Sequence, residues 1–114
     1  MEGSLEGAYV RFYATGDQDN IAMSTIFRTE NNDLRPLASG EVFYLVSLSW
    51  THSAAFAGNV HSNTGAVQAG EYIHNFANVA SGNIEFARPI PIPDPTLEID
   101  TAGTVWGHGF IRKA

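Results

Sequence analysis

The sequence predicts an all-β protein, an antiparallel jelly-roll-like sandwich of about eight short strands. Apolar and polar residues alternate along most of the chain, which is the pattern of strands with one buried face. Eleven Gly and five Pro among 114 residues interrupt that alternation at short intervals, as turns between short strands do. A chain of this length can bury about two-thirds of its surface without disulfides. Because helical spacing is scarce, we expect a sandwich or barrel.

The composition excludes several function classes. Without Cys, the chain has no disulfide framework, thiolate metal site or cysteine nucleophile. A net charge of -6 argues against a nucleic-acid partner. Only 16% of the residues are charged, against about 25% in a typical domain, which suggests that a partner covers part of the surface. No apolar run reaches the ~20 residues of a membrane helix, so we expect no membrane partner.

Residues 1–7 are expected to form a flexible arm ahead of a single domain, residues 8–114. The Gly and Ser residues of the arm lower the cost of remaining disordered. Glu2, Leu5 and Glu6 are its candidate contacts with a partner, and the alternative is a terminus without a role. The arm lacks the basic residue and apolar core of a secretory signal. We therefore expect synthesis in the cytoplasm without export.

The first part of the domain predicts two strands and a loop. Alternate apolar residues from Ala8 to Ala14 form one face of a strand at 8–15, and residues 16–20 form a turn. Residues 21–29 are either a second strand or one amphipathic turn of helix, and their length and β-branched content favour the strand. Pro36 then marks a loop.

The strongest predicted strand spans residues 41–51. Its even-numbered positions, from Val42 to Trp50, are apolar throughout and should line the core. Its odd-numbered positions are apolar at first and then Ser. We therefore expect Phe43 and Leu45 to lie beneath a loop or a neighbouring subunit. The candidate residues for a subunit interface are Phe43, Leu45, Phe56 and Trp106.

Four shorter strands follow, at residues 58–61, 71–79, 84–86 and 96–100. The prolines of segment 88–95 exclude a central strand, because each removes a hydrogen-bond donor from the sheet. We expect this segment to run across an end of the sheets in a polyproline II conformation. Ile90 and Ile92 would anchor it, and Leu97 and Ile99 would face the core.

The last predicted strand, residues 104–111, has Gly107 and Gly109 on one face. Two Gly on one face indicate that a bulky group packs closely there, and the ring of Tyr44 or Trp50 is the expected partner. Trp106 lies on the other face. We expect it to pack in the core, as Trp usually does in a small sandwich.

The residues that carry chemistry are scattered. The four His occur singly, on separate predicted elements, so the expectation is no metal site and no cofactor. A convergence of His61, His74 and His108 in the fold is the alternative. The acidic segment 17–20 lacks the ligand spacing of a calcium loop and is interpreted as a turn. Nucleophile and phosphate-binding motifs are absent, so we expect no enzymatic activity.

Three segments share a strand rhythm with a known group of proteins. Residues 45–55 read Leu-Val-Ser-Leu-Ser-Trp-Thr-His-Ser-Ala-Ala, and residues 83–90 read Asn-Ile-Glu-Phe-Ala-Arg-Pro-Ile. Residues 97–111 close with Gly-Thr-Val-Trp-Gly-His-Gly-Phe-Ile. Over residues 40–114 this resembles the small β-sandwich virion proteins of tailed bacteriophages, namely capsid decoration (cementing) proteins and head-fibre domains.

The resemblance implies a non-enzymatic structural role in a virion. A decoration protein of this kind binds the major capsid protein on the outer capsid surface, usually as a homotrimer, and commonly grips the shell with a chain terminus. Two other readings remain open. One is a fibre, receptor-binding or carbohydrate-binding module that uses Trp106, Tyr72 or Phe56. The other is a small metal-dependent enzyme of cupin type, built on the three His named above.

Overall fold

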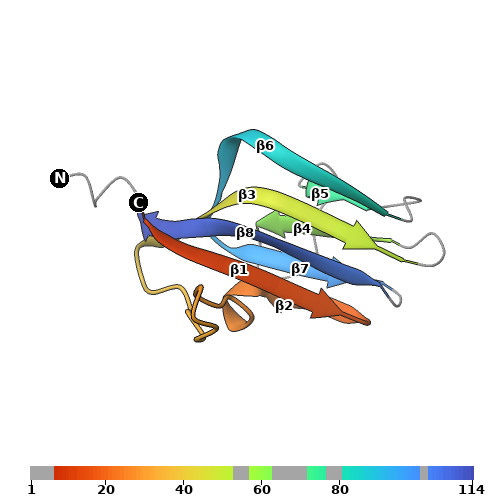
Figure 1. The fold of residues 1–114 in the computed structure, drawn as a ribbon, viewed down its shortest axis with the longest axis horizontal. Helices are drawn as coiled ribbons and strands as arrows, with labels where there is room; N and C mark the ends of the chain where they lie inside the picture. Colours follow the sequence, from red (N-terminus) through yellow and green to blue (C-terminus); the bar gives the residue numbers. More distant parts are fainter. Residues whose placement is uncertain (1–6, 53–56, 63–71, 77–80, 101–102) are drawn as a thin grey trace.

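The computed structural model describes residues 7–52, 57–62, 72–76, 81–100 and 103–114. They form two antiparallel four-stranded sheets that pack as a sandwich (Figure 1). One short 3₁₀ turn, η1 (Met23–Thr25), follows the second strand. The strands are β1 (Ala8–Thr15), β2 (Gln18–Ala22), β3 (Glu41–Thr51), β4 (Gly58–Ser62), β5 (Tyr72–Asn75), β6 (Ser81–Ile92), β7 (Pro95–Ile99) and β8 (Thr104–Lys113).

The order of the strands confirms the predicted class. One sheet has the order β1-β8-β3-β6 and the other has the order β2-β7-β4-β5. The first strand therefore pairs with the last, the second with the seventh, the third with the sixth and the fourth with the fifth. A long hairpin rolled up in this way is the jelly roll, a double-sheet arrangement of eight strands.

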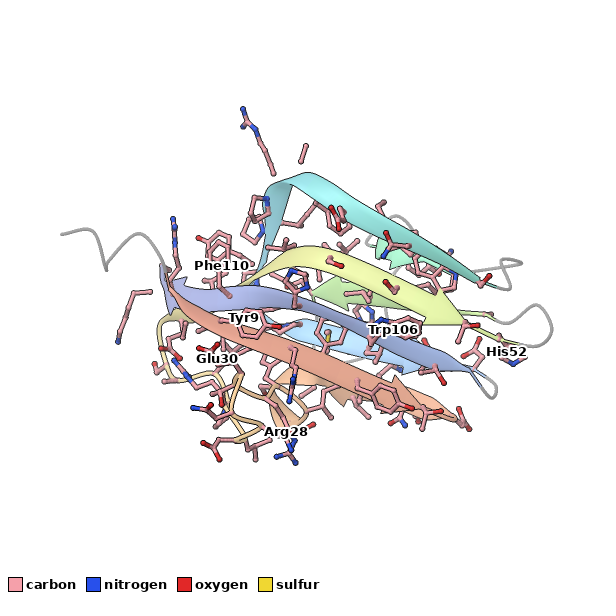
Figure 2. The ribbon with its side chains drawn as sticks, viewed as in Figure 1. Tyr9, Arg28, Glu30, His52, Trp106 and Phe110 are labelled. Carbon is pink, nitrogen blue, oxygen red and sulfur yellow. The ribbon has the colours of Figure 1, made fainter. Side chains whose placement is uncertain are left out.

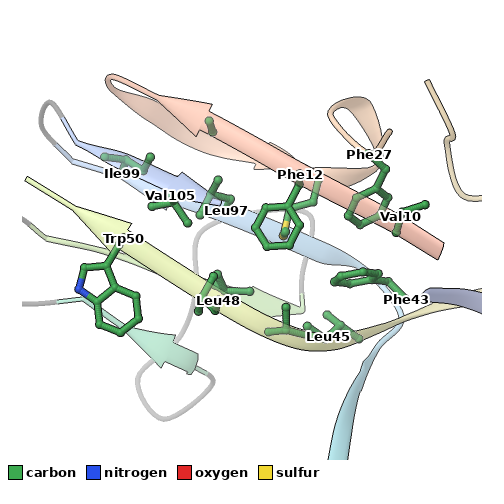
Figure 3. Close-up of a cluster of buried hydrophobic side chains, with 14 of the residues drawn as sticks. Val10, Phe12, Phe27, Phe43, Leu45, Leu48, Trp50, Leu97, Ile99 and Val105 are labelled. Atoms are coloured by element: carbon green, nitrogen blue, oxygen red, sulfur yellow. The ribbon is translucent and has the colours of Figure 1, made fainter. Parts of the chain in front are cut away.

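The core lies between the two sheets (Figure 3). Phe43 lies near one end of the core, with its ring centroid 4.5 Å from that of Phe27 and 6.1 Å from that of Phe12. Trp50 lies at the other end of the core, with its ring centroid 5.2 Å from that of Phe76. No helix in the described part of the chain is long and apolar enough to cross a membrane.

A β-bulge in β3 corrects the predicted faces of that strand. Leu45 pairs with Gly109, but Ser47 pairs with the very next residue, His108. Val46 is therefore an extra residue, and inward-facing positions change from odd to even numbers across it. Phe43 and Leu45 are fully buried in the protein's own core. The prediction that they contact another subunit was wrong, whereas Leu48 and Trp50 do face the core as predicted.

The strand predicted at residues 21–29 was wrong for most of its length. β2 ends at Ala22, and the chain then forms η1, so the alternative of a helical turn was closer. The Thr25 hydroxyl donates a hydrogen bond to the carbonyl of Ala22 at 2.7 Å. Met23 and Phe27 are both fully buried. Arg28 then exchanges backbone hydrogen bonds with Arg11 of β1.

The proline-rich segment forms part of a strand. β6 continues through Pro89 and Pro91 to Ile92, which pairs with Phe43. β6 is at the edge of its sheet, where a missing backbone donor costs little. The exclusion of a central strand was right, but the polyproline path across the end of the sheets was wrong. Ile92 is buried as expected.

The face of β8 that carries two Gly is tightly packed, as predicted. A Cβ added at Gly109 would overlap the carbonyl oxygen of Tyr44 and lie 2.8 Å from the ring of Phe43. A Cβ at Gly107 would overlap the carbonyl oxygen of Ser47 and lie 2.8 Å from the ring of Phe12. The close neighbours are therefore two Phe rings and the β3 backbone, not the rings of Tyr44 or Trp50.

Candidate binding face on strands β1 and β8

The outer face of the β1–β8 pair exposes a group of aromatic side chains. Tyr13 is 62% exposed, Tyr9 44% and Trp106 40%, and Figure 2 shows Tyr9 and Trp106 along the same pair of strands. Alternation dictates this placement, because Val105 and Gly107 on either side of Trp106 face the core. The prediction that Trp106 packs in the core was therefore wrong.

The pairing of β1 with β8 sets these side chains in three rows. Tyr9 pairs with Phe110, Arg11 pairs with His108, and Tyr13 pairs with Trp106. Directly opposed side chains in antiparallel strands lie within contact distance. The ring centroids of Tyr9 and His108 are indeed 5.9 Å apart. Two aromatic rows thus flank a row that carries a guanidinium and an imidazole.

A groove of about 560 Å³ opens over these rows. Ser47 lines it from β3, opposite His108, and Ser49 lies opposite Trp106. Because Ser47 is small, it leaves space beside the aromatic rings. The lining residues are Tyr9, Arg11, Phe12, Tyr13, Ser47, Thr104, Trp106, Gly107 and His108.

A second hollow of about 350 Å³ lies on the other side of β1. It shares Arg11, Phe12 and Tyr13 with the groove and adds Arg28 and Asn32. Arg28 lies beyond the edge of β1 (Figure 2). Neither lining contains an Asp or Glu. A chain with a net charge of -6 therefore presents a surface with two guanidinium groups and no carboxylate.

Asn32 holds the two arginines in place. Its side-chain oxygen accepts a hydrogen bond from Arg11 at 3.2 Å, and its backbone carbonyl accepts one from Arg28 at 3.0 Å. Asn32 has a φ of 69°, a left-handed conformation that Asn tolerates better than most residues. Among the described residues, no carboxylate forms an ion pair with Arg11. Its remaining N–H groups can therefore bind a ligand.

The three candidate metal ligands lie on different faces of the sandwich. His108 is on the outer face of the β1-β8-β3-β6 sheet. His61 is fully buried on β4, with Nδ1 2.5 Å from the side-chain oxygen of Asn59. His74 faces the core, with its ring centroid 4.6 Å from that of Trp50, and burial lowers the pKa of His74. The described residues contain no group of three or more potential ligands. The convergence required by the cupin-type reading does not occur.

Two carboxylates outside the face have shifted pKa values. The Arg35 guanidinium, which binds Glu41 at 2.9 and 3.0 Å, lowers the pKa of Glu41 to about 2, with help from the backbone N–H of Ala38. Burial raises the pKa of Glu98, and the neighbouring Asp100 raises it further. The Glu41 contacts hold the loop before β3. Neither carboxylate lines the groove.

Sequence reasoning found some members of this face and missed their association. Tyr9, Arg11 and Tyr13 share an outward face by alternation alone, as do Trp106 and His108. The sequence carries no signal that these two strands pair, because they are the first and the last of the chain. The other predicted contacts, Glu2, Leu5, Glu6 and Phe56, lie outside the described residues.

Comparisons with protein-family models, with curated proteins and with solved structures find no match. The jelly roll is established by the order and register of the strands alone. The interpretation of function depends on the site and on the strand rhythm described above.

Proposed function

We propose that this chain is a non-enzymatic structural protein of a bacteriophage virion, a capsid decoration protein that binds the major capsid protein on the outer surface of the head. The resemblance of residues 40–114 to such proteins supports the proposal, and so does the fold. Jelly rolls are common in viral capsid proteins. The proposal requires no cofactor and no nucleic acid. Its role is to bridge neighbouring capsid subunits and stabilise the shell.

The way in which the chain enters the sandwich is the observation that carries this proposal. The buried core of the described residues begins at Val10. Gly7 is exposed, with a φ of +72°, and a Cβ there would lie 2.7 Å from the carbonyl oxygen of Ile111. Gly7 is thus a turn that only Gly adopts easily. Residues 1–6 precede this turn, and in this proposal they bind the shell.

A modest affinity per copy is sufficient for this role. Decoration sites repeat around a shell, and linked copies bind multivalently. A homotrimer would use this effect, but the residues predicted to form its interface no longer support it. Phe43 and Leu45 are core residues, Phe56 lies outside the described residues, and Trp106 lines the groove. The trimer therefore depends on the resemblance, and sedimentation equilibrium at micromolar concentration tests it against the chain mass of 12.3 kDa.

Deleting residues 2–6 tests the proposed attachment. We expect the thermal unfolding midpoint to change by less than about 2 °C, because no described core contact is lost. Co-sedimentation with undecorated capsids of the same phage should fall at least tenfold in affinity. A control chain that retains the length of the arm, with residues 2–6 replaced by Gly and Ser, separates loss of specific contacts from loss of length. Undiminished capsid binding by both variants would refute attachment through the arm.

A fibre or receptor-binding module is the second candidate function. The exposed aromatic groove on β1 and β8 favours it, since decoration alone does not require such a site. Copy number in purified virions distinguishes the two functions. Quantitative mass spectrometry should find hundreds of copies for a decoration protein and only a few for a fibre.

A further inference from the structure

We propose that the groove on the outer face of β1 and β8 binds a short anionic oligosaccharide, with Tyr13 and Trp106 stacking on its pyranose rings and Arg11 receiving its carboxylate. This inference does not depend on attachment to a capsid. It depends on three properties of the groove, namely its size, its mixture of aromatic and polar groups, and its charge.

The size fits a ligand of a few sugar rings. The groove encloses about 560 Å³, within the range of ~300–1,000 Å³ that is typical of small-ligand sites. Tyr9 and Tyr13 mark its length on β1, and four residues of strand span about 13 Å. A stable protein interface would need about 800 Å² from each partner, which is larger than this groove and its exposed rings.

The side chains supply both kinds of contact that a pyranose needs. One face of the ring presents C–H groups, which pack against the flat face of Tyr or Trp. The hydroxyl groups at the edge need donors and acceptors, and Ser47, Thr104 and His108 line the groove with both. Tyr13 and Trp106 are a directly opposed pair, so they offer adjoining aromatic surfaces at one end of the groove.

The charges favour an anionic sugar over a neutral one. Arg11 lines both the groove and the hollow beyond β1, where Arg28 adds a second cation. A carboxylate can bind a guanidinium through two parallel hydrogen bonds, and Asn32 occupies only part of the Arg11 fork. Strands β1 and β8 contain no Asp or Glu. Glu85, on β6, pairs with Ser47, about 10 Å and two strand spacings from His108.

The same charges disfavour a nucleic acid. A phosphate chain requires several cations along its path. This chain has six Lys and Arg in total, and Arg35 is already paired with Glu41. With a net charge of -6, the molecule would repel a polyanion as a whole. One or two sugar carboxylates match the two available guanidinium groups.

The test is calorimetric titration with three acidic probes and their uncharged counterparts. The probes are trigalacturonate, trimannuronate and 3′-sialyllactose; the counterparts are the two trisaccharide methyl esters and lactose. We expect at least one acidic probe to bind with a dissociation constant of about 1 mM or tighter. Its counterpart should bind at least tenfold more weakly. Absence of binding by all three acids, or equal binding by acid and counterpart, overturns the proposal.

Matched variants locate the site. Arg11→Gln should weaken binding of the acidic probe about tenfold or more and leave binding of the uncharged counterpart unchanged. Trp106→Ala should weaken both roughly 3- to 10-fold. The controls are Arg88→Gln, an exposed cation on β6, and Tyr72→Ala, an exposed aromatic on the opposite sheet, and neither should alter binding. Chemical shifts of the protein amides confirm that each variant is folded.

Two further outcomes reassign the face. If Trp106→Ala dissociates an oligomer and no sugar binds, the face is an interface between copies of this chain. If Arg11→Gln abolishes capsid binding and no sugar binds, the face contacts the shell. Either result overturns the saccharide proposal, and the second still supports decoration. Conversely, undiminished capsid binding after deletion of the arm, with sugar binding intact, overturns attachment through the arm and leaves the saccharide inference standing.

Discussion

At the scale of single residues, the ion pair between Arg35 and Glu41 shows how one contact positions a whole loop. Arg35 binds the Glu41 carboxylate through both of its terminal nitrogens, and its backbone N–H donates to the carbonyl of Phe27. Phe27 lies fully buried against Phe43. The pair therefore ties the loop before β3 to the segment that covers one end of the core.

Replacing Glu41 with Gln should destabilise the protein by about 1–3 kcal/mol at pH 7, because a charge-assisted pair is lost from a partly buried site. The pKa of Glu41 is about 2 in the fold, below the ordinary 4.5. Its contribution is therefore complete above pH 4.5 and is lost as the pH falls toward 2. Urea unfolding at several pH values should show the parent and the variant converging over that interval.

The control for this measurement is Glu30→Gln, an exposed loop position that forms no ion pair with the described residues. Its stability should stay within about 0.5 kcal/mol of the parent. A constant difference between Glu41→Gln and the parent from pH 7 to pH 2.5 would show that the ionised pair does not hold the loop.

At the scale of secondary-structure elements, the sequence predicts strand positions better than strand faces. Alternation located β1, β3 and β8, because each has an uninterrupted apolar face over most of its length. The face of β3 was wrong at its start because alternation assumes an unbroken register. The sequence of β3 did contain a signal of the bulge. The odd positions are apolar at Phe43 and Leu45 and polar at Ser47 and Ser49, which is a change of phase.

Other errors have a similar physical origin. Residues 21–29 contain enough β-branched residues for a strand, but Met23 and Phe27, four residues apart, both bury their side chains in the core. Tertiary burial overrides local propensity there. The candidate binding face could be predicted only as two separate rows, because the pairing of β1 with β8 joins residues almost 100 positions apart.

Deleting Val46 tests the bulge. Without the extra residue, either Phe43 and Leu45 or Leu48 and Trp50 must leave the core. Exposing two large apolar side chains costs on the order of 3–6 kcal/mol, a large part of the roughly 5–15 kcal/mol that stabilises a domain. We expect the deletion variant to be largely unfolded by circular dichroism at 37 °C.

Val46→Ala is the matched control for that deletion, because it keeps the residue count and therefore the bulge. Val46 is only half-buried, so the substitution should cost less than about 1.5 kcal/mol. A deletion variant as stable as Val46→Ala would mean that β3 can re-register without loss, and that the bulge does not determine which residues form the core.

At the scale of the whole molecule, cations and carboxylates gather in different places. The outer face of the β1–β8 pair carries Arg11 and Arg112, whereas three carboxylates gather beside β7. There Glu98 lies close enough to Asp100 and Asp19 for both to raise its pKa, after burial, which is the largest cause. Such a distribution directs anions toward one face and away from the other. It is consistent with the anionic ligand proposed for the groove.

The acidic side of this arrangement should cost stability that a neutral side chain restores. Glu98→Gln removes one of three neighbouring negative charges and keeps an oxygen that can accept the hydrogen bond from Asn59. We expect a gain of a few tenths to about 1 kcal/mol at pH 7. Because the pKa of Glu98 is raised in the fold, its ionised form opposes folding. The gain should therefore shrink as the pH falls and Glu98 itself becomes protonated.

Urea unfolding at pH 7 and pH 4, at low and high salt, measures this gain in stability. Glu85→Gln, on the other sheet, is the control. A loss of stability in Glu98→Gln at pH 7 would show that the negative charge of Glu98 strengthens its hydrogen bond from Asn59 by more than the repulsion costs.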